Sequence, residues 1–85
     1  MKNKVVIITG ASSGIGKSCA FEFARAGASV VLASRNFELL NEIHNKLISK
    51  GYHSIAIKTD VTNPEDCKHL ILETLRVFKK IDILI

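Results

Sequence analysis

Hydrophobic and polar positions follow two different periods along this chain. Continuous apolar runs rich in Val and Ile are typical of parallel strands buried on both faces, and such runs occur at 5–8, 30–33 and 55–57. A fourth apolar run, 81–85, is interrupted only by Asp82. Between these runs, apolar residues recur every three or four positions, as they do in amphipathic helices. The pattern therefore predicts strict alternation of strands and helices, β-α-β-α-β-α-β.

Residues that begin or end helices flank the three helical segments. Gly27 and Gly51 follow the first two segments, and Asn36 precedes the second as a candidate N-cap. The sequence Thr62-Asn63-Pro64-Glu65 fits a capping box, so we expect the Thr62 hydroxyl to cap the third helix. The apolar stripe predicted to face the core from the first helix consists of Ile15, Cys19, Ala20, Phe23 and Ala26.

The order of elements predicts the fold class. Parallel strands joined by right-handed helical crossovers form an α/β protein, here a Rossmann-type doubly wound parallel sheet with the strand order 3-2-1-4. The last run, 81–85, is as apolar as an internal strand, and such a strand would be prone to associate if it were left at a sheet edge. We therefore expect a truncated sheet, in which residues 1–85 form the N-terminal part of a single domain.

Charge and cysteine usage exclude several classes of protein. The net charge of +4 comes from basic residues scattered along the chain, whereas nucleic-acid binders concentrate them on one face. Cys19 and Cys67 lie in helices expected on opposite faces of the sheet, so a disulfide is not expected, and their spacing from the histidines does not fit a metal site. The first apolar run is too short for a signal peptide or a membrane span. These features favour a cytoplasmic protein without nucleic-acid, membrane or metal partners.

The turn after the first strand is rich in glycine and opens a helix. Helix N-terminal N–H groups bind phosphate when residues without Cβ let the backbone approach closely. Gly10 would allow the tight turn, Gly14 the approach of a pyrophosphate, and Gly16 close packing of the helix on the sheet. Serine hydroxyls and a further N–H add possible donors. The cofactor-binding residues predicted in this turn are Gly10, Ser12, Ser13, Gly14, Ile15 and Gly16.

A second nucleotide-binding motif overlaps this turn. Gly16-Lys17-Ser18 resembles the end of a P-loop, G-x-x-x-x-G-K-[ST]. The first glycine of that motif would fall at position 11, which is Ala11, and Gly10 is one residue too far away. A P-loop nucleotide-binding protein is therefore an alternative that the spacing disfavours.

The ends of the second and third strands supply the remaining candidates. An acid at the end of the second strand would bind the ribose of NAD, but the sequence there is Ser34-Arg35-Asn36. Because a guanidinium pairs with phosphate, we expect Arg35, helped by Ser34, to favour NADP(H) over NAD(H). After the third strand, Asp60 could accept a hydrogen bond from the adenine amino group, and Val61 could form an apolar wall.

Together these segments resemble the classical short-chain dehydrogenases/reductases. The sequence Thr9-Gly10-Ala11-Ser12-Ser13-Gly14-Ile15-Gly16 is similar to their T-G-x-x-x-G-I-G signature, and Ser34-Arg35, Asp60-Val61 and Ile81-Asp82-Ile83-Leu84 match later positions. The resemblance implies an oxidoreductase that reduces a carbonyl or oxidises an alcohol by hydride transfer with NADP(H), and that forms a homo-oligomer.

The catalytic residues of that family have no counterpart in this chain. The family uses Ser, Tyr-x-x-x-Lys and Asn beyond the region that matches, and Tyr52, in the loop before the third strand, does not correspond to the catalytic tyrosine. We therefore expect an NADP(H)-binding fragment that is inactive alone, its parent being the enzyme. A non-catalytic dinucleotide-binding module is the alternative.

Overall fold

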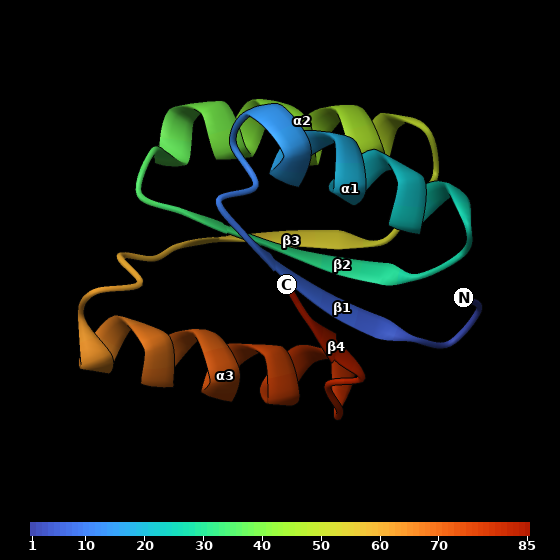
Figure 1. The fold of residues 1–85 in the computed structure, drawn as a ribbon. Coiled ribbons are helices and arrows are strands. Elements are labelled where there is room, and N and C mark those ends of the chain that lie inside the picture. The colour runs from blue at the N-terminus through green and yellow to red at the C-terminus, as the bar shows by residue number, and fades with distance from the viewer.

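Four parallel strands form one sheet in the computed structural model, which describes residues 1–85 (Figure 1). The strand order is β3-β2-β1-β4, as predicted from the alternation of elements. The elements in chain order are β1 (Val5–Thr9), α1 (Gly14–Arg25), β2 (Ser29–Ser34), α2 (Phe37–Ser49), β3 (Ser54–Lys58), α3 (Pro64–Phe78) and β4 (Ile83–Leu84).

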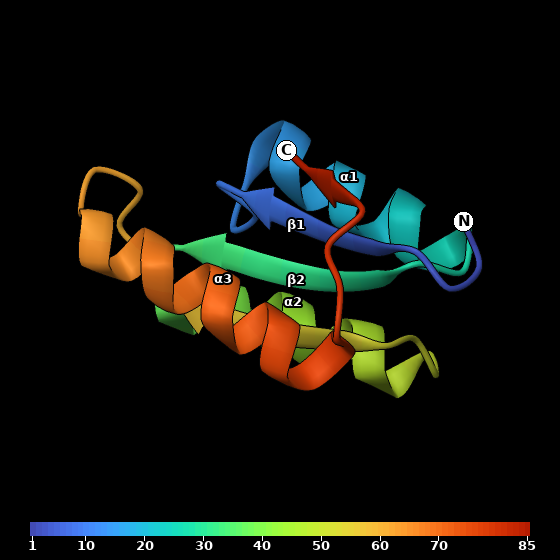
Figure 2. The same ribbon diagram turned by 90° about the horizontal axis from the view of Figure 1, so that it is seen from below.

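Helices cover both faces of the sheet. Helices α1 and α2 lie on one face and α3 lies on the other, as Figures 1 and 2 show from two directions. Cys19 in α1 and Cys67 in α3 are both free, as expected for cysteines on opposite faces. No helix of this protein is both long enough and apolar enough to cross a membrane.

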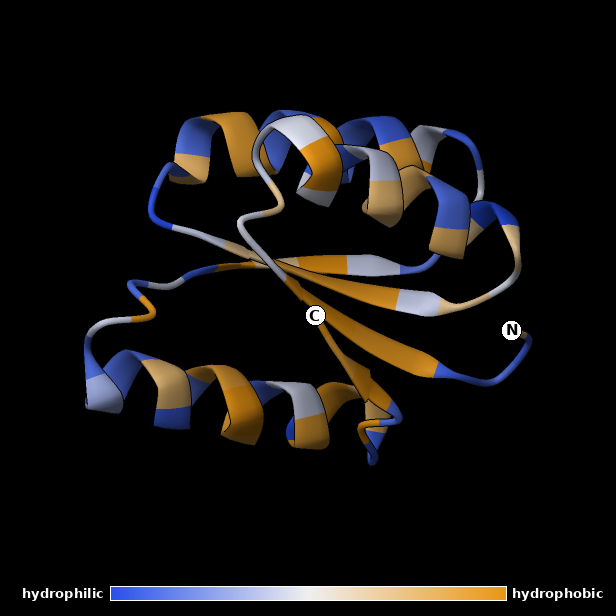
Figure 3. Cartoon of the chain, in the orientation of Figure 1, coloured by the Kyte–Doolittle hydropathy of each residue, from blue (hydrophilic) through white to orange (hydrophobic).

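The side chains of alternate strand residues pack into two separate hydrophobic cores, one on each face of the sheet. Val6 and Ile8 of β1 face the cluster under α1 and α2, whereas Val5 and Ile7 face the cluster under α3. Figure 3 shows the largely hydrophobic strands of the sheet between helices in which hydrophobic and hydrophilic residues alternate. A sheet enclosed in this way explains the continuous apolar runs, because no strand position of β1 needs to face water.

The buried stripe of α1 differs from the predicted one. Ala20 and Ala24 are buried, but Ile15 is 83% exposed and Ala26 is also exposed, so the prediction for these two residues was wrong. Gly16 precedes Ala20 by one turn, and all three residues are small. Because α1 lies close to the sheet, only the smallest residues fit between them. The larger apolar residues of α1 lie on the flanks of the helix.

The cap of α3 also differs from the prediction. Asn63, and not Thr62, is the N-cap, and its side chain accepts hydrogen bonds from Glu65 N–H and Asp66 N–H at 2.9 and 3.4 Å. Pro64, with its φ angle suited to the first turn, begins the helix, so the cap is the residue before it. The Thr62 hydroxyl donates to Asp60 instead.

The short strand β4 is fastened to β1 by both backbone and side chain. Asp82 N–H donates to the Val5 carbonyl at 2.9 Å, and Val5 N–H donates to a carboxylate oxygen of Asp82 at 2.7 Å. The Ile85 N–H donates to the Ile7 carbonyl two residues further along β1. Asp82 therefore has a structural role in joining the two strands.

Candidate functional site

The carboxyl ends of β1, β2 and β3 meet at one edge of the sheet, where their connections to α1, α2 and α3 lie close together (Figure 1). A polar cleft of about 420 Å³ lies at this edge. Its lining residues come from all three connections and are Gly10, Ser12, Ser34, Arg35, Asn36, Thr59, Asp60, Val61 and Thr62. Seven of the predicted cofactor-binding residues are thus brought together. The other four, Ser13, Gly14, Ile15 and Gly16, lie at the start of α1 and do not line this cleft, and Gly14 and Ile15 line a separate hollow beside α1.

The glycine-rich turn has the backbone geometry that its sequence predicts. Gly10 and Gly14 have φ angles of +62° and +58°, in the left-handed region that favours glycine. A Cβ at Gly16 would lie only 2.2 Å from the Gly10 carbonyl oxygen, so the turn and the first helical residues are in direct contact. Only glycine fits at this position.

The start of α1 leaves backbone donors free. Ser13 is the N-cap, but its side chain makes no capping hydrogen bond, and the first backbone bond of the helix runs from Lys17 N–H to the Ser13 carbonyl. The N–H groups of Gly14, Ile15 and Gly16 therefore have no partner within the protein. Together with the positive end of the helix dipole, they suit a pyrophosphate group.

The P-loop alternative fits this geometry poorly. The residue at the position of the missing glycine, Ala11, is fully buried, and its N–H donates to the Ala33 carbonyl at 3.2 Å. That N–H is therefore used to tie the turn to β2 and cannot cradle a phosphate.

Two serine hydroxyls join the glycine-rich turn to the end of β2. The Oγ atoms of Ser12 and Ser34 lie 2.8 Å apart, and Ser34 Oγ also accepts a hydrogen bond from Asn36 N–H at 3.2 Å. The side chain of Asn36 caps α2 by accepting from Leu39 N–H, as its position predicts. Ser34 and Asn36 thus shape the turn that carries Arg35.

Arg35 is exposed and forms no hydrogen bond or ion pair with the protein. Lys58 is the strand neighbour of Ser34, and it lines a second hollow together with Arg35 and Glu38. Lys58 was not predicted from the sequence, because only the register between β2 and β3 places it near Arg35. Two cations therefore lie near the end of β2, with the guanidinium available to an anionic ligand.

Asp60 lies in a small hydrogen-bond network at the end of β3. Its Oδ1 accepts from both the N–H and the hydroxyl of Thr62, at 2.9 and 2.6 Å. These two bonds, with a smaller contribution from the charge of Arg35, hold the pKa of the Asp60 carboxyl below its usual value. The backbone N–H of Asp60 donates to Asp66 Oδ2 at 2.9 Å. Thr62 and Asp66 were not predicted from the sequence as partners of Asp60, nor was Thr59 as a cleft residue.

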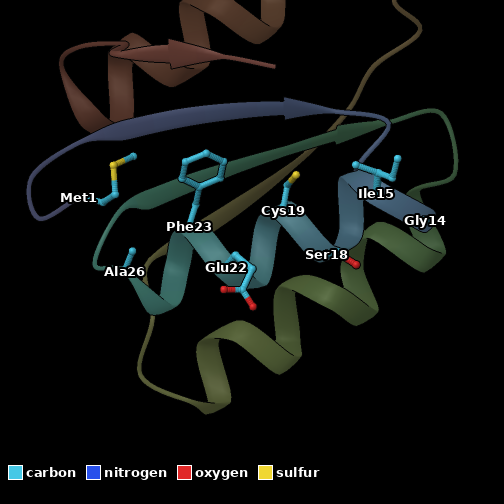
Figure 4. A pocket seen from close by; sticks show the side chains of 8 residues that line it. All are labelled: Met1, Gly14, Ile15, Ser18, Cys19, Glu22, Phe23 and Ala26. Atoms are coloured by element: carbon cyan, nitrogen blue, oxygen red, sulfur yellow. The ribbon is translucent and has the colours of Figure 1, made fainter.

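A larger hollow of about 620 Å³ lies elsewhere, along the side of α1 (Figure 4). Met1, Ile15, Cys19 and Phe23 give it an apolar lining, and Glu22 is its one charged residue. It shares no lining residue with the polar cleft. The polar cleft is the better candidate for a charged ligand, because it contains Arg35, Asp60 and the glycine-rich turn.

Comparisons with known proteins agree with this geometry. The family profile described as short chain dehydrogenase matches residues 4–85. An uncharacterized oxidoreductase of Listeria monocytogenes is 46% identical over 96% of this chain and 33% of its own length. The 11-beta-hydroxysteroid dehydrogenase A of Sesamum indicum is 41% identical over 96% of this chain and 24% of its own length. The chain thus spans a third or less of these curated relatives.

Solved structures match the same region. A short chain dehydrogenase/reductase from Burkholderia phymatum, in complex with NAD, superposes with a TM-score of 0.96 at 34% identity, over 98% of this chain and 30% of that protein. A hydroxysteroid dehydrogenase from Escherichia coli superposes with a TM-score of 0.95 at 36% identity, over 98% of this chain and 35% of that protein.

Proposed function

This chain belongs to the short chain dehydrogenase family, and from that premise we propose that it forms the NADP(H)-binding part of an oxidoreductase. Residues from the ends of three strands would bind the cofactor. The free N–H groups at the start of α1 suit the pyrophosphate, Arg35 suits an added phosphate, and Asp60 suits the adenine amino group.

The preference for NADP(H) over NAD(H) rests on Arg35. Its guanidinium has no protein partner, and no acidic residue occupies Ser34-Arg35-Asn36 at the end of β2. A carboxylate at that position would repel the 2′-phosphate of NADP, whereas a guanidinium can pair with it through two hydrogen bonds. The Burkholderia phymatum protein was solved with NAD, so the overall fold does not separate the two cofactors. Discrimination between NADP(H) and NAD(H) must therefore come from side chains that contact the cofactor.

The contribution of this chain to the reaction would be binding and orientation. The bound nicotinamide cofactor supplies the hydride. The glycine-rich turn and α1 would hold its diphosphate, and the turns after β2 and β3 would hold its adenosine end. None of these residues is proposed to move a proton, so we expect the 85 residues to bind cofactor without catalysing a reaction.

We extend the proposal to the longer parent. Two of the similar proteins are named as hydroxysteroid dehydrogenases, which supports a carbonyl or alcohol as the substrate class. The catalytic residues would lie in the part of those proteins that this chain does not cover. We propose a cytoplasmic homo-oligomeric enzyme as the form in which this cofactor site works.

Calorimetric titration with NADPH and NADH tests the role of Arg35. We expect the unaltered chain to bind NADPH more tightly than NADH. Arg35→Ala should weaken NADPH binding about 10- to 100-fold, the value of a charge-assisted hydrogen bond, and leave NADH binding nearly unchanged. Arg25→Ala is the matched control, because Arg25 is an exposed arginine outside the cleft that pairs with Glu22. Equal affinity of Arg35→Ala and the unaltered chain for NADPH would contradict the proposal.

A further inference from the structure

Asp60 is held in place from two directions. From its own turn, Thr62 donates two hydrogen bonds to Oδ1 of the carboxylate, one from the backbone and one from the hydroxyl. From the first turn of α3, Asp66 accepts a hydrogen bond from the Asp60 backbone N–H at 2.9 Å. Neither the backbone nor the side chain of Asp60 is therefore free to turn without losing a bond.

This arrangement uses one carboxylate oxygen and leaves the other available. Oδ1 already receives two donors, whereas Oδ2 receives no hydrogen bond from the protein. An ionised carboxylate is only an acceptor, so the ligand group that suits Oδ2 is an N–H or O–H donor. Asp60 and Thr62 both line the polar cleft.

The connection to α3 links the cleft to the core. Asp66 is half-buried in the first turn of α3, and Leu70, one turn later, is buried against the face of the sheet that α3 covers. The position of the Asp60 backbone is thereby tied to a packed helix rather than to a free loop. Glu65, the neighbouring acid in the same turn, is exposed, and its side chain takes no part in the hydrogen bonds that hold Asp60.

We propose that Thr62 and Asp66 are positioning residues, which fix Asp60 so that Oδ2 accepts a hydrogen bond from the exocyclic amine of adenine. This inference rests on the proposed cofactor function, which assigns the adenine amine to Asp60, and adds to it the residues that hold the Asp60 carboxylate in place. The two residues act through Asp60, to which both are hydrogen-bonded. Their effect should therefore appear only with ligands that carry the amine.

Paired titrations separate positioning from general stability. The probes are NADPH and its analogue with hypoxanthine in place of adenine, which lacks the exocyclic amine. In the unaltered chain we expect the analogue to bind about 10-fold more weakly, as for a charge-assisted hydrogen bond. In Thr62→Val and Asp66→Ala this ratio should fall toward one. Thr62→Ser and Asp66→Asn keep a donor and an acceptor and should restore it, and the control Glu65→Ala should leave it unchanged.

Each other outcome has a distinct meaning. A ratio that stays at its original value in Thr62→Val and Asp66→Ala overturns the inference, even if both ligands bind more weakly. A ratio of one in the unaltered chain also overturns it, because Asp60 would then recognise no amine. Failure of the unaltered chain to bind either ligand overturns the proposed function itself. If Asp66→Ala does not fold by circular dichroism, Thr62→Val decides, because Thr62 is exposed and this change removes only its hydroxyl bond.

Discussion

At the level of single residues, the start of α1 depends on the absence of one methyl group. A Cβ on Gly16 would lie 2.2 Å from the oxygen and 2.8 Å from the carbon of the Gly10 carbonyl. Both atoms belong to the backbone, so no side-chain rotation can relieve the contact. The glycine-rich turn and α1 would have to separate, and the free N–H groups would move with the helix.

Substitution of this glycine should therefore affect both stability and binding. We expect Gly16→Ala to lower the free energy of unfolding by about 1–3 kcal/mol, as overpacking does, and to abolish measurable NADPH binding. Urea denaturation and calorimetric titration measure the two effects.

Gly51→Ala is the matched control for this prediction. Gly51 has a φ angle of +83° but has open space around its Cβ position, and it lies after α2, outside the cleft. This change should cost about 1 kcal/mol from backbone strain alone and leave NADPH binding intact. Unimpaired NADPH binding by Gly16→Ala would show that the close contact does not shape the site.

At the level of elements, α3 shows how neighbouring residues divide two tasks. Asn63 caps the helix, whereas Thr62 turns back to hold the Asp60 carboxylate. Both residue types are good N-caps, so the sequence by itself offers either one. Helix stability and cleft geometry are thus controlled by separate adjacent side chains.

Two alanine substitutions distinguish these tasks. Asn63→Ala should lower the free energy of unfolding by about 1 kcal/mol, the usual value of a lost N-cap. Thr62→Ala should change stability by less than half as much, because the Thr62 side chain bonds to no N–H of α3. Urea denaturation of both variants provides the measurement, and equal losses would indicate that Thr62 shares in capping.

At the level of the whole molecule, one carboxylate adds to the backbone hydrogen bonds that join β4 to β1. Asp82, near the C-terminal end of the chain, accepts from Val5 N–H of β1 and also pairs with Lys80 at 3.1 Å. The Val5 hydrogen bond, followed by the interaction with Lys80, lowers the pKa of the Asp82 carboxyl from its ordinary value of 3.8. The charged Asp82 carboxylate therefore contributes to the attachment of the edge strand β4 to β1.

This charge makes part of the stability depend on pH. A carboxyl whose pKa is lower in the folded state stabilises the fold above its ordinary pKa, and this contribution is lost as the pH falls through the folded-state value. Below pH 5, the urea concentration at the midpoint of unfolding should therefore fall more steeply with decreasing pH for the unaltered chain than for Asp82→Asn. Parallel pH profiles of the two proteins would contradict a role for the Asp82 charge.

The arrangement of the elements and the place of the candidate site follow from the sequence alone. The change between strand and helix periods specified the four strands and three helices, and the preference for right-handed crossovers led to the order 3-2-1-4. In such a sheet the carboxyl ends of the strands share one edge, so Gly10, Arg35 and Asp60 had to converge there. The strand order and the shared edge depend on local residue patterns and on topology, and both can be inferred from neighbouring residues in the sequence.

Contacts between particular side chains become apparent only in the folded molecule. The exposure of Ile15, the use of Asn63 as the cap, the position of Lys58 beside Arg35 and the bond from Asp60 to Asp66 were not apparent from the sequence. Each depends on how closely a helix packs on the sheet, on the register of two strands, or on which of several polar partners a side chain meets. Differences of a few tenths of an ångström in packing determine which residues come into contact, whereas hydrophobic periodicity specifies only which face of an element is buried.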